Sequence, residues 1–185
     1  MNYESKIVCL KNGQSALFRT PLITDSEAEA MMEFLSTCAR ETEFVIRYPE
    51  ECTETPMQEA AYLEGINQSE NQLMIVCEID GEIAGNCQIV FNNKIKTKHR
   101  AEVMVGILQK YWGLGIGTAM FGEMFRIAER RQVRQIELEY IEGNERGRRL
   151  YEKMGFVQYG ERPDAIRFRD GTMRKEILMI RKMCS

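Results

Sequence analysis

The spacing of apolar and polar residues predicts one strand and two helices in the first part of the chain. Residues 15–19 alternate as in a half-buried strand, and Pro21 ends that strand because proline cannot donate to a sheet ladder. Residues 24–27 have the Thr-x-x-Glu sequence of a helix-capping box, and apolar residues follow at helical spacing: Ala28, Met31, Met32 and Leu35. Residues 55–58 repeat the capping sequence, with proline at the first helical position, and predict a second helix to about Asn67.

The middle of the chain has the pattern of a hairpin, a third strand and a helix. Residues 72–79 and 82–91 are apolar strand-like runs, and Asp80-Gly81 between them is a strong signal for a tight turn. Residues 101–108 form a further apolar run, and residues 119–131 carry apolar side chains on a helical stripe. We therefore expect an antiparallel pair of strands, then a strand and a helix.

The last part of the chain predicts three more strands and a short helix. Residues 136–141 alternate as a strand, and residues 144–154 form a short helix that stops at Gly155. Residues 156–160 and 176–181 are the last two predicted strands, and an Asp-Gly turn precedes the second.

This order of elements predicts an α/β fold, or α+β on a stricter definition, in which helices flank a mixed, mostly antiparallel sheet. The length of 185 residues is usual for one domain, so we expect a single domain over residues 1–185, with residues 1–14 as a possible N-terminal extension. Residues 41–54 are irregular and acidic.

The composition predicts a soluble, cytoplasmic protein that binds neither nucleic acid nor membranes. Hydrophobic residues make up 44% of the chain and charged residues 29%, which is typical of a folded globular protein. The net charge is -3, whereas binding to a phosphate backbone needs an excess of clustered Lys and Arg. Nowhere do 18 apolar residues run together, and the N-terminus lacks the apolar core of a signal peptide.

The cysteines argue against a metal site. They are spaced singly, without a Cys-x-x-Cys pair, and His99 is the only imidazole in the sequence. We expect reduced thiols, two of which, Cys77 and Cys87, lie in apolar strand-like runs and act as small hydrophobic residues. The six cysteines are Cys9, Cys38, Cys52, Cys77, Cys87 and Cys184.

A glycine-rich segment lies between an apolar strand and a helix. Gly113, Gly115 and Gly117 let the backbone approach an oxygen-rich ligand, and amides at the start of a helix favour phosphate. The segment therefore indicates either a diphosphate site or a tight turn that binds nothing. A nucleoside-triphosphate loop is excluded because Thr118 follows Gly117 without the required lysine.

A dinucleotide-binding fingerprint is the alternative interpretation of this segment. Glu137 and Glu139, on one face of a predicted strand, lie about where the ribose-binding acid of that fingerprint belongs. Its third small residue is replaced by Met120, and the fingerprint belongs in an early unit of a larger sheet. A nicotinamide-dependent oxidoreductase is thus the second functional hypothesis.

Two motifs resemble the GNAT superfamily of N-acetyltransferases. Residues 112–117 are similar to the family's Gln/Arg-x-x-Gly-x-Gly/Ala signature, with Trp112 in place of Gln or Arg. Asn144, followed seven residues later by Tyr151 before Gly155-Phe156, resembles the second motif, with Gly147 in place of alanine. The order of segments resembles the small group that includes ribosomal-protein N-terminal and polyamine acetyltransferases.

The resemblance implies acetyl-CoA as acetyl donor, no metal, and a set of donor-binding residues. Tyr151 would protonate the departing thiolate, although without the motif it would be a core tyrosine. Asn144 would hold the donor or the acceptor backbone and cap a helix. The other implied donor-binding residues are Val105, Gly106 and Ile107, with Gly106 at a bulge, and Trp112, Gly113, Leu114, Gly115, Ile116, Gly117 and Thr118.

Attack by an amine requires a group that accepts its proton, directly or through water. By family position the candidates are Glu139, which we prefer, and Glu102; for each, a solvated strand residue is the alternative. His99 ranks third because it lies in an exposed basic loop. The arginines 146, 148 and 149 suit either the 3'-phosphate of CoA or a solvated helix face, which we favour.

The acceptor is expected to be a small-molecule amine or a peptide N-terminus, and residues 41–54 and 161–172 would shape its site. Four glutamates in the first stretch would attract a cation or simply form an acidic loop: Glu41, Glu43, Glu50 and Glu51. A CoA-binding module without catalysis is a third hypothesis. A homodimer is compatible with an unpaired sheet edge.

Overall fold

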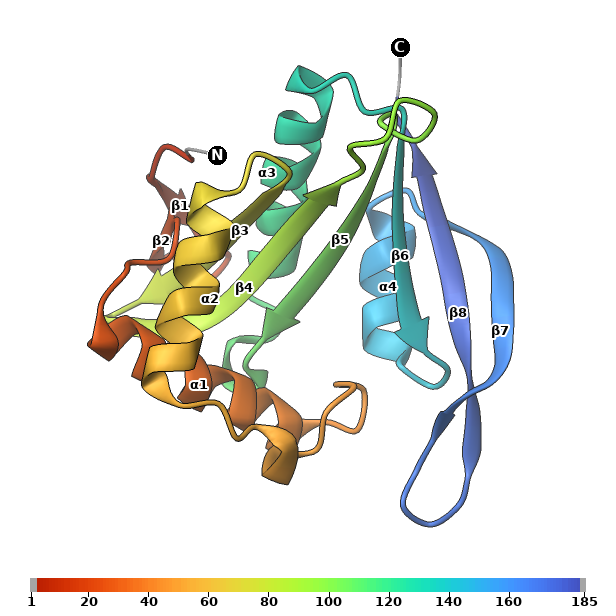
Figure 1. Ribbon diagram of the computed structural model, residues 1–185, viewed down its shortest axis with the longest axis horizontal. Helices are drawn as coiled ribbons and strands as arrows, with labels where there is room; N and C mark the ends of the chain where they lie inside the picture. The colour runs from red at the N-terminus through yellow and green to blue at the C-terminus, as the bar shows by residue number, and fades with distance from the viewer. Residues whose placement is uncertain (1–2, 184–185) are drawn as a thin grey trace. The chain divides into compact units, whose positions relative to one another are not determined.

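The computed structural model describes residues 3–183, so Cys184 lies outside the described residues. Within that range it has an eight-stranded sheet in the order β1-β2-β3-β4-β5-β6-β8-β7, and four α-helices (Figure 1). The pairs β1–β2, β2–β3, β3–β4, β6–β8 and β7–β8 are antiparallel, and β5–β6 is parallel. The predicted fold class, a mixed and mostly antiparallel sheet with flanking helices, is confirmed.

The chain contains two compact units. The first comprises residues 3–90 and 104–122, and the second comprises residues 91–103 and 123–183. The prediction of a single domain stays a prediction.

The first unit begins with a hairpin and two helices. Its elements are β1 (Lys6–Cys9), β2 (Ser15–Arg19), α1 (Asp25–Glu41), η1 (Pro49–Glu51) and α2 (Pro56–Gln68). The bounds of β2 are as predicted, and α2 runs one residue beyond the predicted end. Strand β1, which lies in the predicted N-terminal extension, and the short 3₁₀ helix η1 were not predicted.

The two capping boxes turn out differently. At α2 the box is complete, because Thr55 accepts the Gln58 amide and Gln58 accepts the Thr55 amide. At α1 only half forms: Thr24 accepts the amide of Glu27, but the Glu27 carboxylate binds Arg19 through two hydrogen bonds of 2.6 and 2.9 Å. A bidentate guanidinium pair is stronger than one bond back to an amide, so the glutamate joins the buried strand residue instead.

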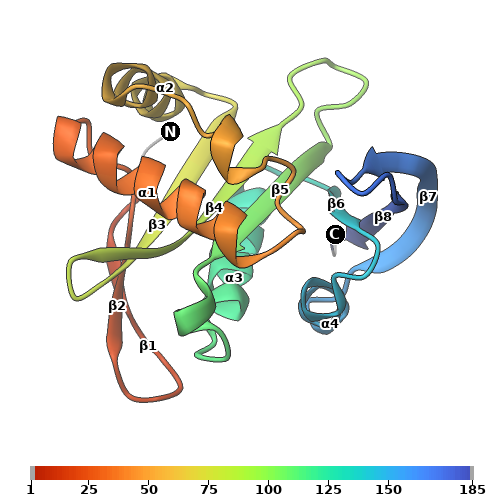
Figure 2. The ribbon, with the colours of Figure 1, turned by 90° about the horizontal axis from the view of Figure 1, so that it is seen from below.

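Helices α1 and α2 lie side by side on β3 and β4, as Figure 2 shows. The predicted bounds of β3 (Gln72–Ile79) and β4 (Glu82–Phe91) are confirmed. The turn between them has Asp80 at φ 51° and Gly81 at φ 82°, the left-handed pair of a tight hairpin. Apolar residues of both helices and both strands form the core: Met31, Phe34, Cys38, Leu63, Ile66, Met74, Val76, Ile83 and Leu108.

Strand β5 (Arg100–Ile107), the 3₁₀ helix η2 (Gln109–Tyr111) and helix α3 (Ile116–Arg130) follow, with parts in each unit. Helix α3 begins three residues before the predicted start at Ala119. The second unit continues with β6 (Gln135–Ile141), α4 (Glu145–Lys153), β7 (Val157–Arg167) and β8 (Met173–Lys182). Helix α4 ends before Gly155 at φ 83°, which confirms the predicted left-handed stop.

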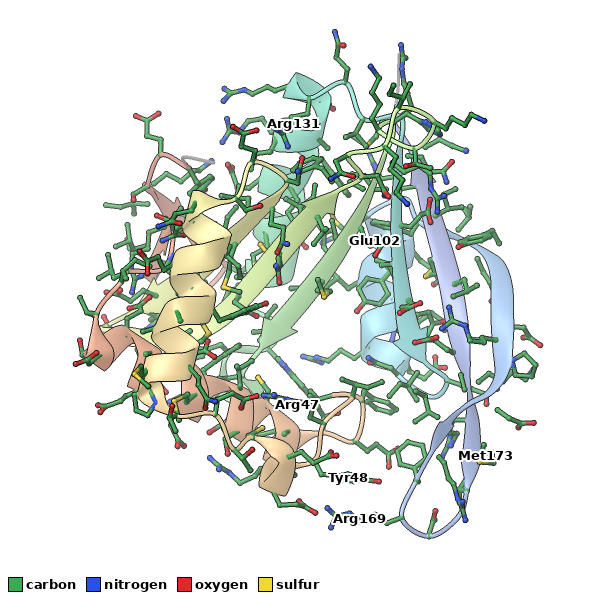
Figure 3. All side chains as sticks on the ribbon, viewed as in Figure 1. Arg47, Tyr48, Glu102, Arg131, Arg169 and Met173 are labelled. Atoms are coloured by element: carbon green, nitrogen blue, oxygen red, sulfur yellow. The ribbon has the colours of Figure 1, made fainter. Side chains whose placement is uncertain are left out.

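Strands β7 and β8 are longer than predicted. Their pairing continues to Arg167↔Met173, with irregularities around Gly160 and between Arg162 and Ile166. Figure 3 labels Arg169, in the turn between the two strands, and Met173, the first residue of β8. Cross-strand pairing therefore extends a segment that has no strand pattern of its own, because Pro163 and polar residues interrupt the alternation.

Candidate active site

The glycine-rich segment is part loop and part helix. Gly113 has φ 84° and Gly115 has φ 94°, conformations that residues with a side chain rarely adopt. Helix α3 starts at Ile116, and the amide of Ala119 donates to the carbonyl of Gly115 at 3.0 Å. The amides of the first helical turn have no carbonyl four residues before them within the helix, so this end suits an anion. The segment therefore fits a diphosphate.

Trp112 fixes this loop to β5. Its indole N–H donates to the carbonyl of Ile107 at 2.8 Å. The residue that departs from the family signature thus uses its polar hydrogen within the protein. Trp112 and Ile107 come from the two predicted donor-binding segments of the first unit, so the structure brings those segments together.

Gly106 is crowded from two sides. A Cβ atom on Gly106 would lie 3.3 Å from the side-chain oxygen of Asn86 and 3.5 Å from the ring of Phe34. A Cβ atom on Gly85 of β4 would lie 2.8 Å from the carbonyl oxygen of Gly106, a distance that real contacts do not reach. Strand β4 therefore needs glycine at position 85, whereas a side chain at position 106 would require the Asn86 side chain to shift by a few tenths of an ångström. The predicted bulge at Gly106 stays a prediction, and Gly85 is a residue that the sequence analysis missed.

Tyr151 lies in an aromatic cluster of the second unit. Its ring centroid is 5.6 Å from that of Tyr140 on β6 and 6.4 Å from that of Phe156, which in turn is 6.0 Å from Phe125 of α3. Desolvation, with a smaller contribution from Tyr140, raises the pKa of Tyr151 to about 12, although the residue is partly accessible to solvent. The phenol is therefore protonated at neutral pH and can donate a proton.

Tyr140 was not singled out by sequence analysis. Its ring contacts that of Tyr151, and desolvation also raises its pKa. The strand alternation of residues 136–141 places Tyr140 and Glu139 on opposite faces of β6, and this signal was available in the sequence.

Asn144 is the N-cap of α4. Its side-chain oxygen accepts the amide of Gly147 at 2.9 Å, so the capping role predicted for it is confirmed. A Cβ atom on Gly147 would lie within 2.9 Å of the end of the Asn144 side chain, so alanine there would require that side chain to shift.

Glu102 and Glu139 share one face of the second unit's sheet. Glu102 pairs with Glu137 in the parallel register of β5 and β6, and Glu139 is two residues further along β6. Both candidate bases are exposed; Glu102 is marked in Figure 3, and Glu139 lies 3.5 Å from Arg162. This face of β6 is opposite to the face that carries Tyr140.

The carboxylate of Glu137 is engaged in an ion pair with Arg100. Its carboxylate accepts two hydrogen bonds from Arg100, at 2.7 and 2.6 Å, and this guanidinium is the main cause that lowers its pKa. One of the two acids considered for a ribose contact is therefore part of a partly buried ion pair. His99 lies in an exposed turn, as predicted, and Arg146 and Arg149 are exposed on α4. Arg148 binds Glu145 and Glu152.

The acidic stretch after α1 is partly used in the fold. Glu41 accepts the amide of Gln109 at 2.6 Å, and Glu51 accepts the amide of Tyr48 at 2.7 Å. Glu43 and Glu50 are exposed. Arg47, marked with Tyr48 in Figure 3, pairs with a further acid of the stretch, Glu54.

No helix within residues 3–183 is long and apolar enough to cross a membrane. Among the same residues, no three or more His, Cys, Asp or Glu side chains are grouped to hold a metal ion. Cys38, Cys77 and Cys87 are buried, Cys9 and Cys52 are more accessible, and none of these five cysteines forms a disulfide.

Comparison with known proteins identifies the family. The model of the acetyltransferase (GNAT) family matches residues 29–156, which include both the glycine-rich segment and Tyr151. A comparison with curated proteins gives no match.

Solved structures share the fold at low sequence identity. An acetyltransferase of the GNAT family from Streptococcus pneumoniae is 23% identical, with a TM-score of 0.82 over 91% of this chain and 99% of that chain. The ribosomal-protein-alanine N-acetyltransferase of Brucella melitensis is 19% identical, with a TM-score of 0.75 over 90% and 99%. The protein yncA of Salmonella typhimurium, solved with its cofactor acetyl-CoA, is 16% identical, with a TM-score of 0.74 over 90% and 93%.

The family match decides between the hypotheses raised by the glycine-rich segment. The chain therefore belongs to the acetyltransferase (GNAT) family, and it is an acetyl-CoA-dependent N-acetyltransferase.

Proposed function

We propose that the protein transfers the acetyl group of acetyl-CoA to a primary amine by direct attack of the amine on the thioester. The observation that carries this proposal is that the family match over residues 29–156 spans both the glycine-rich segment and the helix with Tyr151. Acetyl-CoA supplies an activated acetyl group, and the residues of this chain bind it, hold protons in place and receive the amine.

The donor is held largely by backbone. The amides at the start of α3 and the loop at Gly113 and Gly115 bind the diphosphate, for which the positive φ angles of both glycines are suited. Residues 105–107 of β5 pair with the pantetheine arm. The bond from the Trp112 indole to the Ile107 carbonyl holds the glycine-rich loop against the end of β5. Asn144 contributes from the N-cap of α4.

Tyr151 holds the proton for the thiolate at its phenolic oxygen. A phenol with a pKa of about 12 retains its proton at any ordinary assay pH, so it can donate a hydrogen bond to the departing thiolate and be the source of the proton that the thiol takes up. Tyr140, 5.6 Å away between ring centroids, keeps the environment apolar and neutral.

A carboxylate or water accepts the proton of the amine, and Glu139 and Glu102 are two exposed carboxylates on one face of the sheet. Glu139 is the preferred base. Glu102 makes no hydrogen bond or ion pair within the described residues, so it is tested alongside.

The acceptor is a small-molecule amine or a peptide N-terminus. A peptide N-terminus draws support from the name of the Brucella melitensis relative, which acetylates a ribosomal-protein alanine. We further propose a homodimer through an edge of the sheet, of which β1 and β7 are the two outer strands.

Ligand-dependent thermal unfolding tests the donor assignment. Acetyl-CoA at about 100 times its Kd should stabilise the protein by roughly 2.7 kcal/mol, and NAD at the same concentration should have no effect. A shift with NAD alone, or with neither ligand, would overturn the proposal. A shift with acetyl-CoA but no turnover on a panel of amines and peptides would instead favour a binding module.

Steady-state acetylation by two matched variants tests the base. We expect Glu139→Gln to lower kcat/KM strongly and Glu102→Gln, on the same face, to lower it much less. A large loss only in Glu102→Gln would transfer the role to Glu102.

A further inference from the structure

The turn of the β1–β2 hairpin contacts the glycine-rich loop. The amide of Lys11 donates to the carbonyl of Leu114 at 3.0 Å. In Figure 2 this turn lies beside the loop that precedes α3. Strand β1 therefore brings a residue from near the N-terminus to a loop more than a hundred positions later in the chain.

The turn has its own hydrogen bonds, so the position of Lys11 is well defined. The amide of Leu10 donates to the carbonyl of Gln14 at 2.8 Å, and the amide of Gly13 donates to the carbonyl of Leu10 at 3.0 Å. Gly13 has φ 87°, and the Asn12 side chain accepts the amide of Gln14 at 3.1 Å. Leu10 is buried. These contacts hold the turn without any help from the Lys11 side chain.

The stem of Lys11 runs along Gly115. The Cγ, Cδ and Cε atoms of Lys11 lie 3.4, 3.8 and 3.6 Å from the position of a Cβ atom on Gly115. Three successive carbons at near-equal distances show that the side chain lies flat on the glycine. The ammonium group, one bond beyond Cε, is therefore held next to the start of α3.

The Lys11 ammonium is available to a ligand at the glycine-rich loop. Residues 112–118 contain no charged side chain, and the neighbouring Lys110 is paired with Glu82 at 2.6 Å. Within residues 3–183 the Lys11 ammonium has no hydrogen bond or ion pair. A diphosphate would receive only partial charge from the helix amides, so an unpaired cation beside them adds a full positive charge.

We propose that Lys11 is a donor-binding residue, whose ammonium contacts the diphosphate of CoA at the glycine-rich loop. The inference rests on the proposed function for the donor site, and it adds a side chain from the β1–β2 hairpin to a site otherwise built from backbone. It also gives β1 a role: the strand holds the turn that positions Lys11.

Affinity measurements with matched variants test this contact. Lys11→Met keeps the apolar stem on Gly115 and removes the charge, and we expect it to weaken CoA binding about 5-fold, measured by titration calorimetry. Lys11→Arg should restore most of the affinity. Lys96→Met, which removes the same charge from an exposed turn, should bind CoA as the wild type does. In steady state, KM for acetyl-CoA should rise in Lys11→Met while kcat is unchanged.

Truncated ligands locate the contact. With 3'-dephospho-CoA, which keeps the diphosphate, Lys11→Met should show the same loss relative to wild type. With pantetheine, which has no phosphate, the two proteins should bind equally. A loss that disappears with 3'-dephospho-CoA would overturn the diphosphate assignment and point to the 3'-phosphate, and a loss that persists with pantetheine would reduce Lys11 to a packing role.

The proposal and the function on which it rests fail in different ways. Wild type that does not bind CoA would overturn the donor site itself. Wild type that binds CoA, with equal affinity in Lys11→Met and an unchanged apo melting temperature, would overturn only the role of Lys11.

Discussion

The glycine-rich loop and the aromatic cluster around Tyr151 are built in opposite ways. The loop offers backbone amides, positive φ angles at Gly113 and Gly115, and no charged side chain of its own. The cluster offers side chains, with rings from β6 and from the segment after α4 packed against the phenol of Tyr151. A ligand at the loop therefore contacts main-chain atoms, whereas the proton donated at the cluster comes from a single side-chain oxygen.

This difference predicts how substitutions in each region affect binding and catalysis. A side chain added to the loop strains the backbone, so binding of the donor should suffer while the chemistry persists. A hydroxyl removed from the cluster keeps the packing and takes away the proton, so kcat should fall while binding persists. Kinetics that separate KM from kcat therefore discriminate between the two regions.

The largest effect is expected from Tyr151→Phe. The ring contacts with Tyr140 and Phe156 remain, but the proton donor is gone, so kcat should fall by about 100-fold. KM for acetyl-CoA should change little because the proposed diphosphate contacts are elsewhere in the chain. Steady-state acetylation of the best amine in a panel measures both.

Tyr140→Phe is the matched control, because it removes a hydroxyl from the same ring pair. It should leave kcat nearly unchanged. If Tyr140→Phe lost as much activity as Tyr151→Phe, the proton donor would be misassigned. For the wild type, ionisation of Tyr151 should affect kcat only as the pH approaches about 12, since the raised pKa keeps the phenol protonated below that.

Gly85→Ala should lower the stability of the backbone frame that carries Gly106. The new Cβ would meet a carbonyl oxygen at 2.8 Å, and main chain cannot move aside easily, so we expect a loss of about 2 kcal/mol. The melting temperature should fall by about 6 °C. Gly65→Ala, on α2 with nothing near its Cβ, should be neutral or stabilising, and equal melting of the two variants would contradict the close approach.

Gly115→Val should weaken donor binding with little change in kcat. A β-branched residue at φ 94° costs about 1–2 kcal/mol of backbone strain, and part of this should appear as an approximately 10-fold higher Kd for CoA. Gly122→Ala, within α3 and with open space at its Cβ, controls for a general effect on that helix. Undiminished CoA affinity in Gly115→Val would show that the loop conformation does not matter for the ligand.

Local patterns predicted the elements whose signals are contained in a short stretch of sequence. The hairpin β3–β4 was predicted with its true bounds, because Asp80-Gly81 fixes the turn and the flanking runs are apolar. The start of α3 was missed, because glycines 115 and 117 suggest a loop, whereas the structure uses the first of them just before the helix and the second inside it. Strand β1 is short and mostly exposed, so only its pairing with β2 reveals it.

The parts of the site that could not be predicted depend on contacts between distant residues. Trp112, Tyr151 and Asn144 were found through motifs. Neither the approach of Gly85 to Gly106 nor the contact of Lys11 with Gly115 has a local signature, because in each case the partners meet only when strands and loops pack. Composition and periodicity describe one stretch of sequence at a time. These contacts depend on two stretches that are distant in the sequence.

The smallest predicted effect concerns Asn144. It combines features of both regions, because its side chain binds a backbone amide. Asn144→Ala removes the bond to the Gly147 amide and should cost about 1 kcal/mol of stability, seen as a lower melting temperature. Asn144→Ser keeps a capping oxygen and should restore most of that stability. If Asn144 only caps α4, the serine variant will also have the wild-type KM for acetyl-CoA and for the amine. If the amide side chain also contacts a substrate, the serine variant will be stable but have a raised KM, because its shorter side chain reaches the cap and no further.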